Sequence, residues 1–271
     1  MVGNSRLRTA IQHGEVETLD PALIVNPHLE GDAFFWEGNE TGILLSHGFT
    51  ATTAEVRPLS RILHEHGYTV AGPLLPGHFT RPEELNRVYW RDWLDSVIEA
   101  YSRLSTRCRH VFVGGESTGA LLALMLASDH PEIAGILAYA PALILKITSL
   151  DLIRLALLAP FIPYVQEHKE VSGLPWQGYY VLPLKGALQL LKLQRQVRAC
   201  LSSIRQPVLI VQGVHDARVA SHAPQIILQK ISSSVKELHW MAESSHVAIL
   251  DRELEQVAEI TLKFIRNNLP S

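Results

Sequence analysis

The stretch that decides the fold reads His110-Val111-Phe112-Val113-Gly114-Gly115-Glu116-Ser117-Thr118-Gly119. Its apolar run 110–114 predicts a buried strand, and the apolar segment 118–128 predicts a helix directly after it. The small residues Gly115 and Gly119 flank Ser117 at a distance of two and let neighbouring backbones come close. A sharp strand-to-helix turn would expose the Ser117 hydroxyl above the sheet edge, at the positive N-terminus of the helix. The alternative is a glycine-rich turn in which Ser117 only caps the helix.

On both sides of this turn, short β-rich runs alternate with segments of helical periodicity. This alternation predicts a mostly parallel central sheet with helices on both faces. The predicted strands are 22–25, 33–37, 42–46, 68–75, 110–114, 133–140, 208–213 and 235–241. The predicted helices lie around residues 56–63, 90–104, 118–128, 224–231 and 250–264.

The alternation breaks between about residues 142 and 205, where helical periodicity continues and no strand is predicted. Prolines divide this region into short pieces. We interpret 142–205 as a helical cap, or lid, inserted into a core formed by residues 1–141 and 206–271.

An acid and a base follow the two strands predicted after the insertion. Asp216 lies in the loop after strand 208–213, and His246 lies in the loop after strand 235–241. Ser, acid, His is the chain order of the α/β-hydrolase fold. A serine hydroxyl is a weak nucleophile without a base, so we expect His246 to accept the Ser117 proton and Asp216 to orient His246. The alternatives are that Asp216 only ends a turn and that His246 only caps the last helix.

Two backbone N–H groups are candidate donors to an oxyanion. In this fold one donor belongs to the residue after the nucleophile, here Thr118. The other belongs to the loop after an early strand, and His47-Gly48-Phe49 follows strand 42–46. We therefore assign the second donor to Phe49, with a plain turn as the alternative.

Several segments together resemble the bacterial carboxylesterase and monoacylglycerol lipase family. They are 44–50, 55–59, 77–78, 82–85, 115–119, 211–216 and 244–246. The resemblance covers roughly residue 41 to the end and is weakest in the cap. It implies a cytoplasmic esterase of the α/β-hydrolase fold with a helical cap, a Ser-Asp-His triad and no cofactor. It also implies a preference for short or medium acyl chains.

The chain departs from the family pattern beside the nucleophile and in the rim of the site. Glu116 and Thr118 stand where the family often has leucine, and Ala120 replaces a glycine. A carboxylate facing the site would disfavour an oxyanion, so we expect Glu116 to point away and to be paired. Phe79 replaces the second glycine of Gly-His-Gly, which predicts an altered pocket rim.

The charge, hydropathy and cysteine content of the chain exclude several classes of function. The 271 residues carry a net charge of −3, which gives no basic footprint for nucleic acid. The longest apolar stretch, 142–163, contains Lys146, Asp151 and Arg154, so no stable membrane insertion is expected. The two cysteines are expected to be free, and no secretory signal is recognised at the N-terminus. We predict a cytoplasmic protein with no metal, and the cap face is a candidate contact for a homodimer.

The sequence thus predicts a serine carboxylesterase that hydrolyses short- to medium-chain esters, with monoacylglycerols among the candidates, through an acyl-enzyme. Segment 144–162 should line the acyl pocket, with ordinary helix packing as the alternative. Three aromatic residues are also expected to face the pocket: Trp176, Tyr179 and Tyr180. The rival functions are lactone, amide or carbon–carbon bond hydrolysis on the same scaffold, and a catalytically weak ligand-binding protein.

Overall fold

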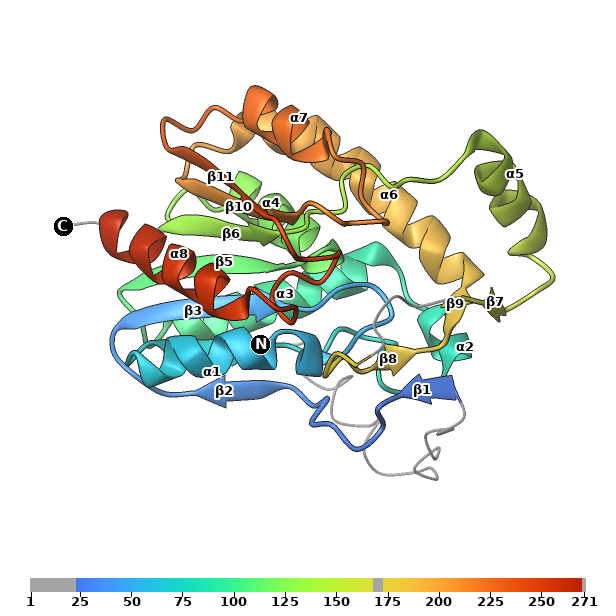
Figure 1. Ribbon diagram of the computed structural model, residues 1–271, viewed down its shortest axis with the longest axis horizontal. Coiled ribbons are helices and arrows are strands. Elements are labelled where there is room, and N and C mark those ends of the chain that lie inside the picture. Colours follow the sequence, from blue (N-terminus) through green and yellow to red (C-terminus); the bar gives the residue numbers. More distant parts are fainter. Residues whose placement is uncertain (1–22, 168–172, 270–271) are drawn as a thin grey trace, which may run out of the picture.

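The computed structural model describes residues 23–167 and 173–269, and its centre is one seven-stranded sheet (Figure 1). The strands are β2 (Phe34–Trp36), β3 (Thr41–Ser46), β4 (Thr69–Gly72), β5 (His110–Glu116), β6 (Gly135–Tyr139), β10 (Val208–Gly213) and β11 (Lys236–Met241). Their order is β11-β10-β6-β5-β3-β4-β2, parallel throughout except for β2 against β4. The predicted mostly parallel sheet is confirmed, and every core strand lies where it was predicted, with ends shifted by at most three residues.

Helices cover both faces of the sheet, because successive strand residues point to opposite sides. The helices of the fold are α1 (Arg57–Glu65), α2 (Pro82–Leu85), α3 (Trp90–Ser105), α4 (Thr118–Asp129), α5 (Ser149–Leu158), α6 (Leu184–Cys200), α7 (Ala223–Lys230) and α8 (Leu254–Asn267). On β3, Leu44 packs in the core cluster with α3, α4 and α6, whereas Ile43 and Leu45 pack in the cluster with α1 and α8. The inner strands of the sheet are therefore buried on both faces, which explains their mostly apolar sequences.

The described part of residues 142–205 contains three short strands as well as helices, so the prediction of no strand there was wrong. Strand β7 (Tyr164–Gln166) pairs with β9 (Val181–Pro183), and β8 (Gly178–Tyr179) pairs with β1 (Ile24–Val25). Strands of two or three residues are too short to show the alternation by which a strand is recognised in sequence. The predicted strand 22–25 is present as β1, although Ala22 lies outside the described residues.

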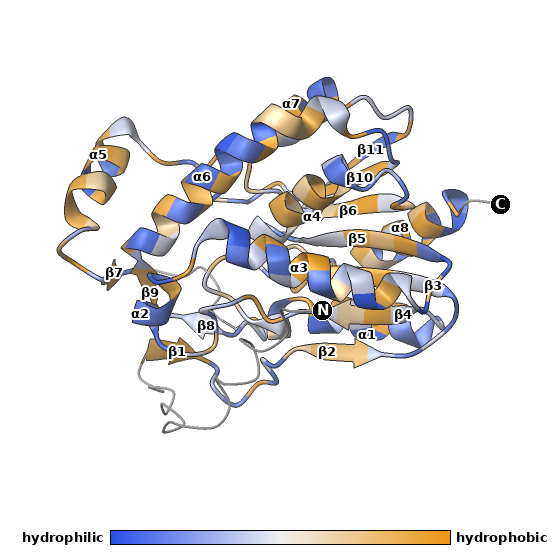
Figure 2. Ribbon diagram, turned by 180° about the vertical axis from the view of Figure 1, so that it is seen from behind, coloured by the Kyte–Doolittle hydropathy of each residue, from blue (hydrophilic) through white to orange (hydrophobic). Residues whose placement is uncertain are grey.

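The two helices of this region differ in how they pack. No residue of α5 is buried, and its apolar Leu150, Ile153 and Leu157 are exposed. Figure 2 shows this largely hydrophobic helix standing away from the central sheet. The longer α6 runs back to the body of the molecule, where Leu193 and Val197 are fully buried. The division of the chain at 142 and 205 into core and cap stays a prediction.

Gly119 sets how closely α4 lies on the sheet, and its replacement should be costly. A Cβ at this position would lie 2.0 Å from the backbone oxygen of Ser46, which cannot move without shifting β3. We expect Gly119→Ala to lower the free energy of unfolding by about 3 kcal/mol, at the upper end of overpacking effects. Urea unfolding measures this, with the exposed helical Ser102→Ala as control, for which a change within about 0.5 kcal/mol is expected. A loss below about 1 kcal/mol in Gly119→Ala would show that the contact relaxes easily.

Candidate active site

Ser117 occupies the turn between β5 and α4 in a backbone conformation that residues other than glycine rarely adopt. Its φ and ψ are 55° and −104°. Such a residue costs about 1–3 kcal/mol and persists only where surrounding structure enforces it. Here the Ser117 N–H donates to the Tyr139 oxygen at 2.8 Å, and a Cβ on Gly115 would lie only 2.2 Å from the Ser46 oxygen. Close backbone packing on both sides therefore holds the serine in place.

The structure brings Ser117, His246 and Asp216 together in one hydrogen-bonded chain. His246 Nε2 lies 3.0 Å from Ser117 Oγ, and His246 Nδ1 lies 2.8 Å from Asp216 Oδ2. The three residues follow β5, β11 and β10, whose carboxyl ends meet at one edge of the sheet. This arrangement allows His246 to take a proton from Ser117 while Asp216 holds the ring. The catalytic roles themselves stay predictions.

The hydrogen bonds around Asp216 stabilise its ionised form. Its Oδ1 accepts the backbone N–H groups of Arg218 and Val219 at 2.7 and 2.9 Å, and its Oδ2 also accepts Gln212 Nε2. Burial raises the pKa of this carboxyl, but the hydrogen bond and charge interaction with His246 and the two backbone N–H groups outweigh it. The net pKa lies below the usual 3.8, so Asp216 is ionised at neutral pH.

The Gly48–Phe49 peptide is held by the buried ring of His47. His47 Nε2 lies 3.0 Å from the Leu75 N–H, which can only donate, so Nδ1 carries the ring proton and donates to the Gly48 oxygen at 2.9 Å. Burial lowers the pKa of His47 to about 4, which keeps the ring neutral. In a trans peptide the C=O and N–H point in opposite directions, so fixing the Gly48 oxygen also fixes the Phe49 N–H.

The two predicted oxyanion donors have no hydrogen-bond acceptor within the part of the chain that the structure describes. Neither the Phe49 N–H nor the Thr118 N–H donates to a described acceptor. Thr118 is the first residue of α4, where the N–H groups of a helix have no partner within the helix. Both groups are thus available to a ligand, and their role as oxyanion donors stays a prediction.

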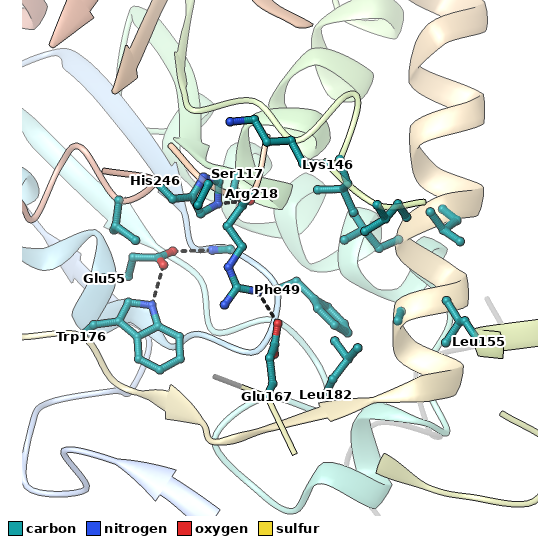
Figure 3. A pocket seen from close by; sticks show the side chains of 18 residues that line it. Phe49, Glu55, Ser117, Lys146, Leu155, Glu167, Trp176, Leu182, Arg218 and His246 are labelled. Carbon is teal, nitrogen blue, oxygen red and sulfur yellow. Dashed lines mark hydrogen bonds and ion pairs between the residues drawn. The ribbon is translucent and has the colours of Figure 1, made fainter. Parts of the chain in front are cut away.

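A cavity of about 470 Å³ opens at Ser117 (Figure 3). Its apolar wall consists of Phe49, Leu145, Ile147, Leu155, Trp176, Leu182, Ala187, Leu190, Leu191, Ala217 and Val247. It is also lined by four charged residues that were not singled out from the sequence: Glu55, Lys146, Glu167 and Arg218. Arg218 and Glu167 form an ion pair, and Lys146 Nζ donates to the Asp216 backbone oxygen.

The expectations for the pocket wall hold for some residues and fail for others. Segment 144–162 contributes Leu145, Ile147 and Leu155 as expected, and Trp176 also lines the cavity. Tyr179 and Tyr180 do not: the Tyr179 hydroxyl is turned to the Gly77 oxygen at 2.9 Å, and Tyr180 is exposed to solvent. Phe79, expected at the rim, packs against the core instead, with a φ of 54°.

Glu116 is fully buried, and the expectation that it would be paired was wrong. Neither carboxyl oxygen has a hydrogen-bond partner among the described residues, and the side chain does not line the cavity. Burial, and then the nearby charges of Glu55 and Asp216, raise the pKa of Glu116 well above 4.5. Burial therefore favours the neutral form of this carboxyl in the folded protein.

The raised pKa of Glu116 makes the stability of the protein depend on pH in a testable direction. The folded-state pKa lies above the unfolded value of about 4.5, so the contribution of Glu116 to stability is lost as pH rises above that value. We expect Glu116→Gln to gain stability relative to the wild type by up to about 1.4 kcal/mol per pH unit above pH 4.5. Urea unfolding between pH 5 and 7 measures this, with exposed Glu65→Gln as control. A difference that stays constant with pH would show that Glu116 is ionised in the folded state.

Among 23–167 and 173–269, no group of three or more His, Cys, Asp or Glu side chains could hold a metal ion. No helix in these ranges is long and apolar enough to cross a membrane. Cys108 and Cys200 are free, as expected.

Comparison with known sequences places the chain in a family. The model of the alpha/beta hydrolase family matches residues 43–260. A thermostable monoacylglycerol lipase of Bacillus sp. (strain H-257) is 35% identical over 239 residues, which are 88% of this chain and 96% of the lipase. A carboxylesterase of Bacillus subtilis (strain 168) is 30% identical over 240 residues, or 86% of this chain and 95% of the esterase.

Solved structures show the same relationship. One from a study of the metagenome-derived lipolytic enzymes LipS and LipT is 32% identical and superimposes with a TM-score of 0.83, covering 88% of this chain and 98% of the other. A monoacylglycerol lipase of Paleococcus ferrophilus shares the fold at 15% identity and a TM-score of 0.73, over 89% of this chain and all of the other. The fold, the family match and the two relatives agree: the chain belongs to the alpha/beta hydrolase family.

Proposed function

We propose that this chain is a carboxylic ester hydrolase that works through an acyl-enzyme on Ser117. The single observation that carries the proposal is the chain of contacts from Ser117 Oγ to His246 and on to Asp216, at 3.0 and 2.8 Å. The relatives named as a monoacylglycerol lipase and a carboxylesterase support the same bond type.

In the proposed mechanism the Ser117 Oγ attacks the ester carbonyl while its proton passes to His246 Nε2. The N–H groups of Phe49 and Thr118 stabilise the oxyanion of the tetrahedral intermediate. His246 then protonates the leaving alcohol, and an acyl-enzyme remains on Ser117. A water molecule, deprotonated by His246, attacks this acyl group and releases the acid.

The substrate class follows from the cavity. Its volume of about 470 Å³ falls in the usual range of small-molecule sites, and aliphatic and aromatic side chains make up most of its wall. Such a wall fits a short or medium apolar acyl chain. We propose small apolar esters as substrates, with monoacylglycerols among them because one relative carries that name.

Hydrolysis of para-nitrophenyl esters from acetate to dodecanoate tests this function, together with a monoacylglycerol, a lactone and an anilide. We expect turnover of the esters and a single optimum of chain length. Turnover of the lactone or the anilide alone would favour the rival hydrolase chemistries. Tight binding of an apolar ligand without any product would favour a ligand-binding role.

Ala187 offers a test of the acyl pocket. It lies on α6 with its side chain in the cavity wall, so a larger side chain would shorten the space for an acyl chain. We expect Ala187→Leu to lower kcat/KM for the dodecanoyl ester by about tenfold relative to the acetyl ester. The exposed Ala242→Leu is the control and should leave this ratio unchanged. An equal change for both esters would place the acyl chain elsewhere.

A cytoplasmic location and a homodimer through the cap are proposals that rest on the sequence alone. Sedimentation velocity of the purified chain tests the dimer, because a monomer at micromolar concentration would contradict it.

A further inference from the structure

Glu55 is a buried carboxylate in the cavity wall to which the proposed reaction gives no role. It ends the short 3₁₀ helix η2 (Thr53–Glu55), and the residue is only 3% exposed. Its Oε2 accepts the Gly48 N–H at 2.6 Å, and its Oε1 accepts the Trp176 indole N–H at 2.8 Å (Figure 3). A buried charge is expensive unless such bonds compensate it, so its position calls for an explanation.

The first bond acts on the same backbone segment that carries the Phe49 N–H. Gly48 is held at both ends: its oxygen accepts from His47, and its N–H donates to Glu55. A Cβ on Gly48 would lie 3.1 Å from Glu55 Oε2 and 3.3 Å from Ser117 Cβ, so Glu55 and Ser117 enclose Gly48. The side chains of His47 and Glu55 together thus restrict the rotation of the Gly48–Phe49 peptide, which presents the Phe49 N–H.

The second bond reaches the inserted region. Trp176 belongs to residues 142–205 and is 3% exposed, so its buried indole N–H needs an acceptor. The residues after Trp176 are hydrogen-bonded to the backbone just after Phe49. The Thr52 N–H donates to the Gln177 oxygen at 3.0 Å, and the Tyr179 N–H donates to the Thr50 oxygen at 2.9 Å. The Glu55 carboxylate therefore links Trp176 to Gly48, which lies beside Ser117.

We propose that Glu55 is a positioning residue for ester hydrolysis, whose carboxylate sets the direction of the Phe49 N–H and couples the inserted segment at Trp176 to the oxyanion hole. The inference rests on the proposed function. A carboxylate suits this task because each of its oxygens accepts one of the two N–H donors. A carboxamide has a single oxygen, so one donor would face an NH₂ group.

Glu55→Gln and Trp176→Phe test the proposal on the full chain, separately and combined. Misplacing an oxyanion donor affects the transition state more than substrate binding. We expect Glu55→Gln to lower kcat for the butyryl ester about 10- to 100-fold with KM changed less than about threefold. Trp176→Phe, which keeps the carboxylate, should lower kcat about threefold or more. The double variant should be no slower than Glu55→Gln, because both remove one connection.

A second readout separates positioning from mere stability. A butyl trifluoromethyl ketone forms a tetrahedral adduct with a nucleophilic serine, whereas the corresponding methyl carbinol only occupies the pocket. We expect Glu55→Gln to weaken the ketone by the factor lost in kcat and to leave binding of the carbinol unchanged. Circular dichroism checks folding, and the exposed Glu65→Gln is the matched control.

The outcomes distinguish this inference from the proposed function. If the wild type turns over the ester and Ser117→Ala does not, the proposed function is supported. The kcat of Glu55→Gln then tests the role of Glu55 by itself. A kcat within about twofold of the wild type, or equal weakening of ketone and carbinol, would overturn it. If Glu55→Gln does not fold, an unchanged kcat in Trp176→Phe overturns the coupling. A wild type without turnover contradicts the function itself, and the inference falls with it.

Discussion

Ser117→Ala should lower kcat on a short-chain ester by about 10⁵- to 10⁶-fold, the loss typical of removing the nucleophile from a serine triad. The Ser117 Oγ is the atom 3.0 Å from His246 Nε2, and alanine removes this nucleophilic oxygen while His246 Nδ1 keeps its contact with Asp216. Water attack assisted only by the oxyanion donors would account for the residual rate. Serine and alanine both carry a Cβ, so the φ of 55° costs about the same in either, and the fold should persist.

The measurement is single-turnover and steady-state release of para-nitrophenol from the butyrate ester. The wild type should also show a burst if release of the acyl group is slow, and the alanine variant should show none. Ser102→Ala, at an exposed position of α3, is the control and should keep wild-type kcat. Residual activity above about 1% in Ser117→Ala would identify a different nucleophile or a different site.

The gathering of Ser117, Asp216 and His246 could be predicted because each signal is local in the sequence. Ser117 and Asp216 follow apolar runs that predict buried strands, His246 follows a third predicted strand, and parallel strands bring their carboxyl ends to one edge. Chain order together with a position in the loop after a strand then selects His246 from 13 histidines. The fold could be predicted for the same reason, since alternating strands and helices allow few topologies.

The surroundings of the site depend on contacts between residues far apart in the sequence. Glu55 and Trp176 are 121 residues apart, and no pattern in either segment indicates that they meet. Tyr179 and Tyr180 were expected to face the pocket, but neither lines it. Tyr179 lies in β8 with its hydroxyl bonded to the Gly77 oxygen, and the next side chain, Tyr180, is exposed to solvent. Glu116 was expected to find a partner, yet it has none among the described residues, and burial raises its pKa, which favours the neutral form.

Asp216→Asn should lower kcat by about 10⁴-fold, the loss expected when a triad histidine is held in the wrong tautomer. Asp216 Oδ1 accepts two backbone N–H groups, from Arg218 and Val219. Backbone N–H groups cannot reverse their role, so the single oxygen of asparagine has to take this position. The asparagine NH₂ group then occupies the place of Oδ2 and faces His246 Nδ1, which lies 2.8 Å away in the wild type.

An NH₂ group in that place can only donate, so His246 Nδ1 must become the acceptor and the ring proton must move to Nε2. A protonated Nε2 cannot take the proton of Ser117 Oγ, although the distances hardly change. Because asparagine enforces the wrong tautomer whereas alanine only removes the support, Asp216→Asn should be at least as slow as Asp216→Ala. Nitrogen-15 NMR of the histidine rings identifies the tautomer directly, and the exposed Asp95→Asn is the control. A kcat within about tenfold of the wild type, or a proton still on Nδ1, would show that Asp216 does not set the state of His246.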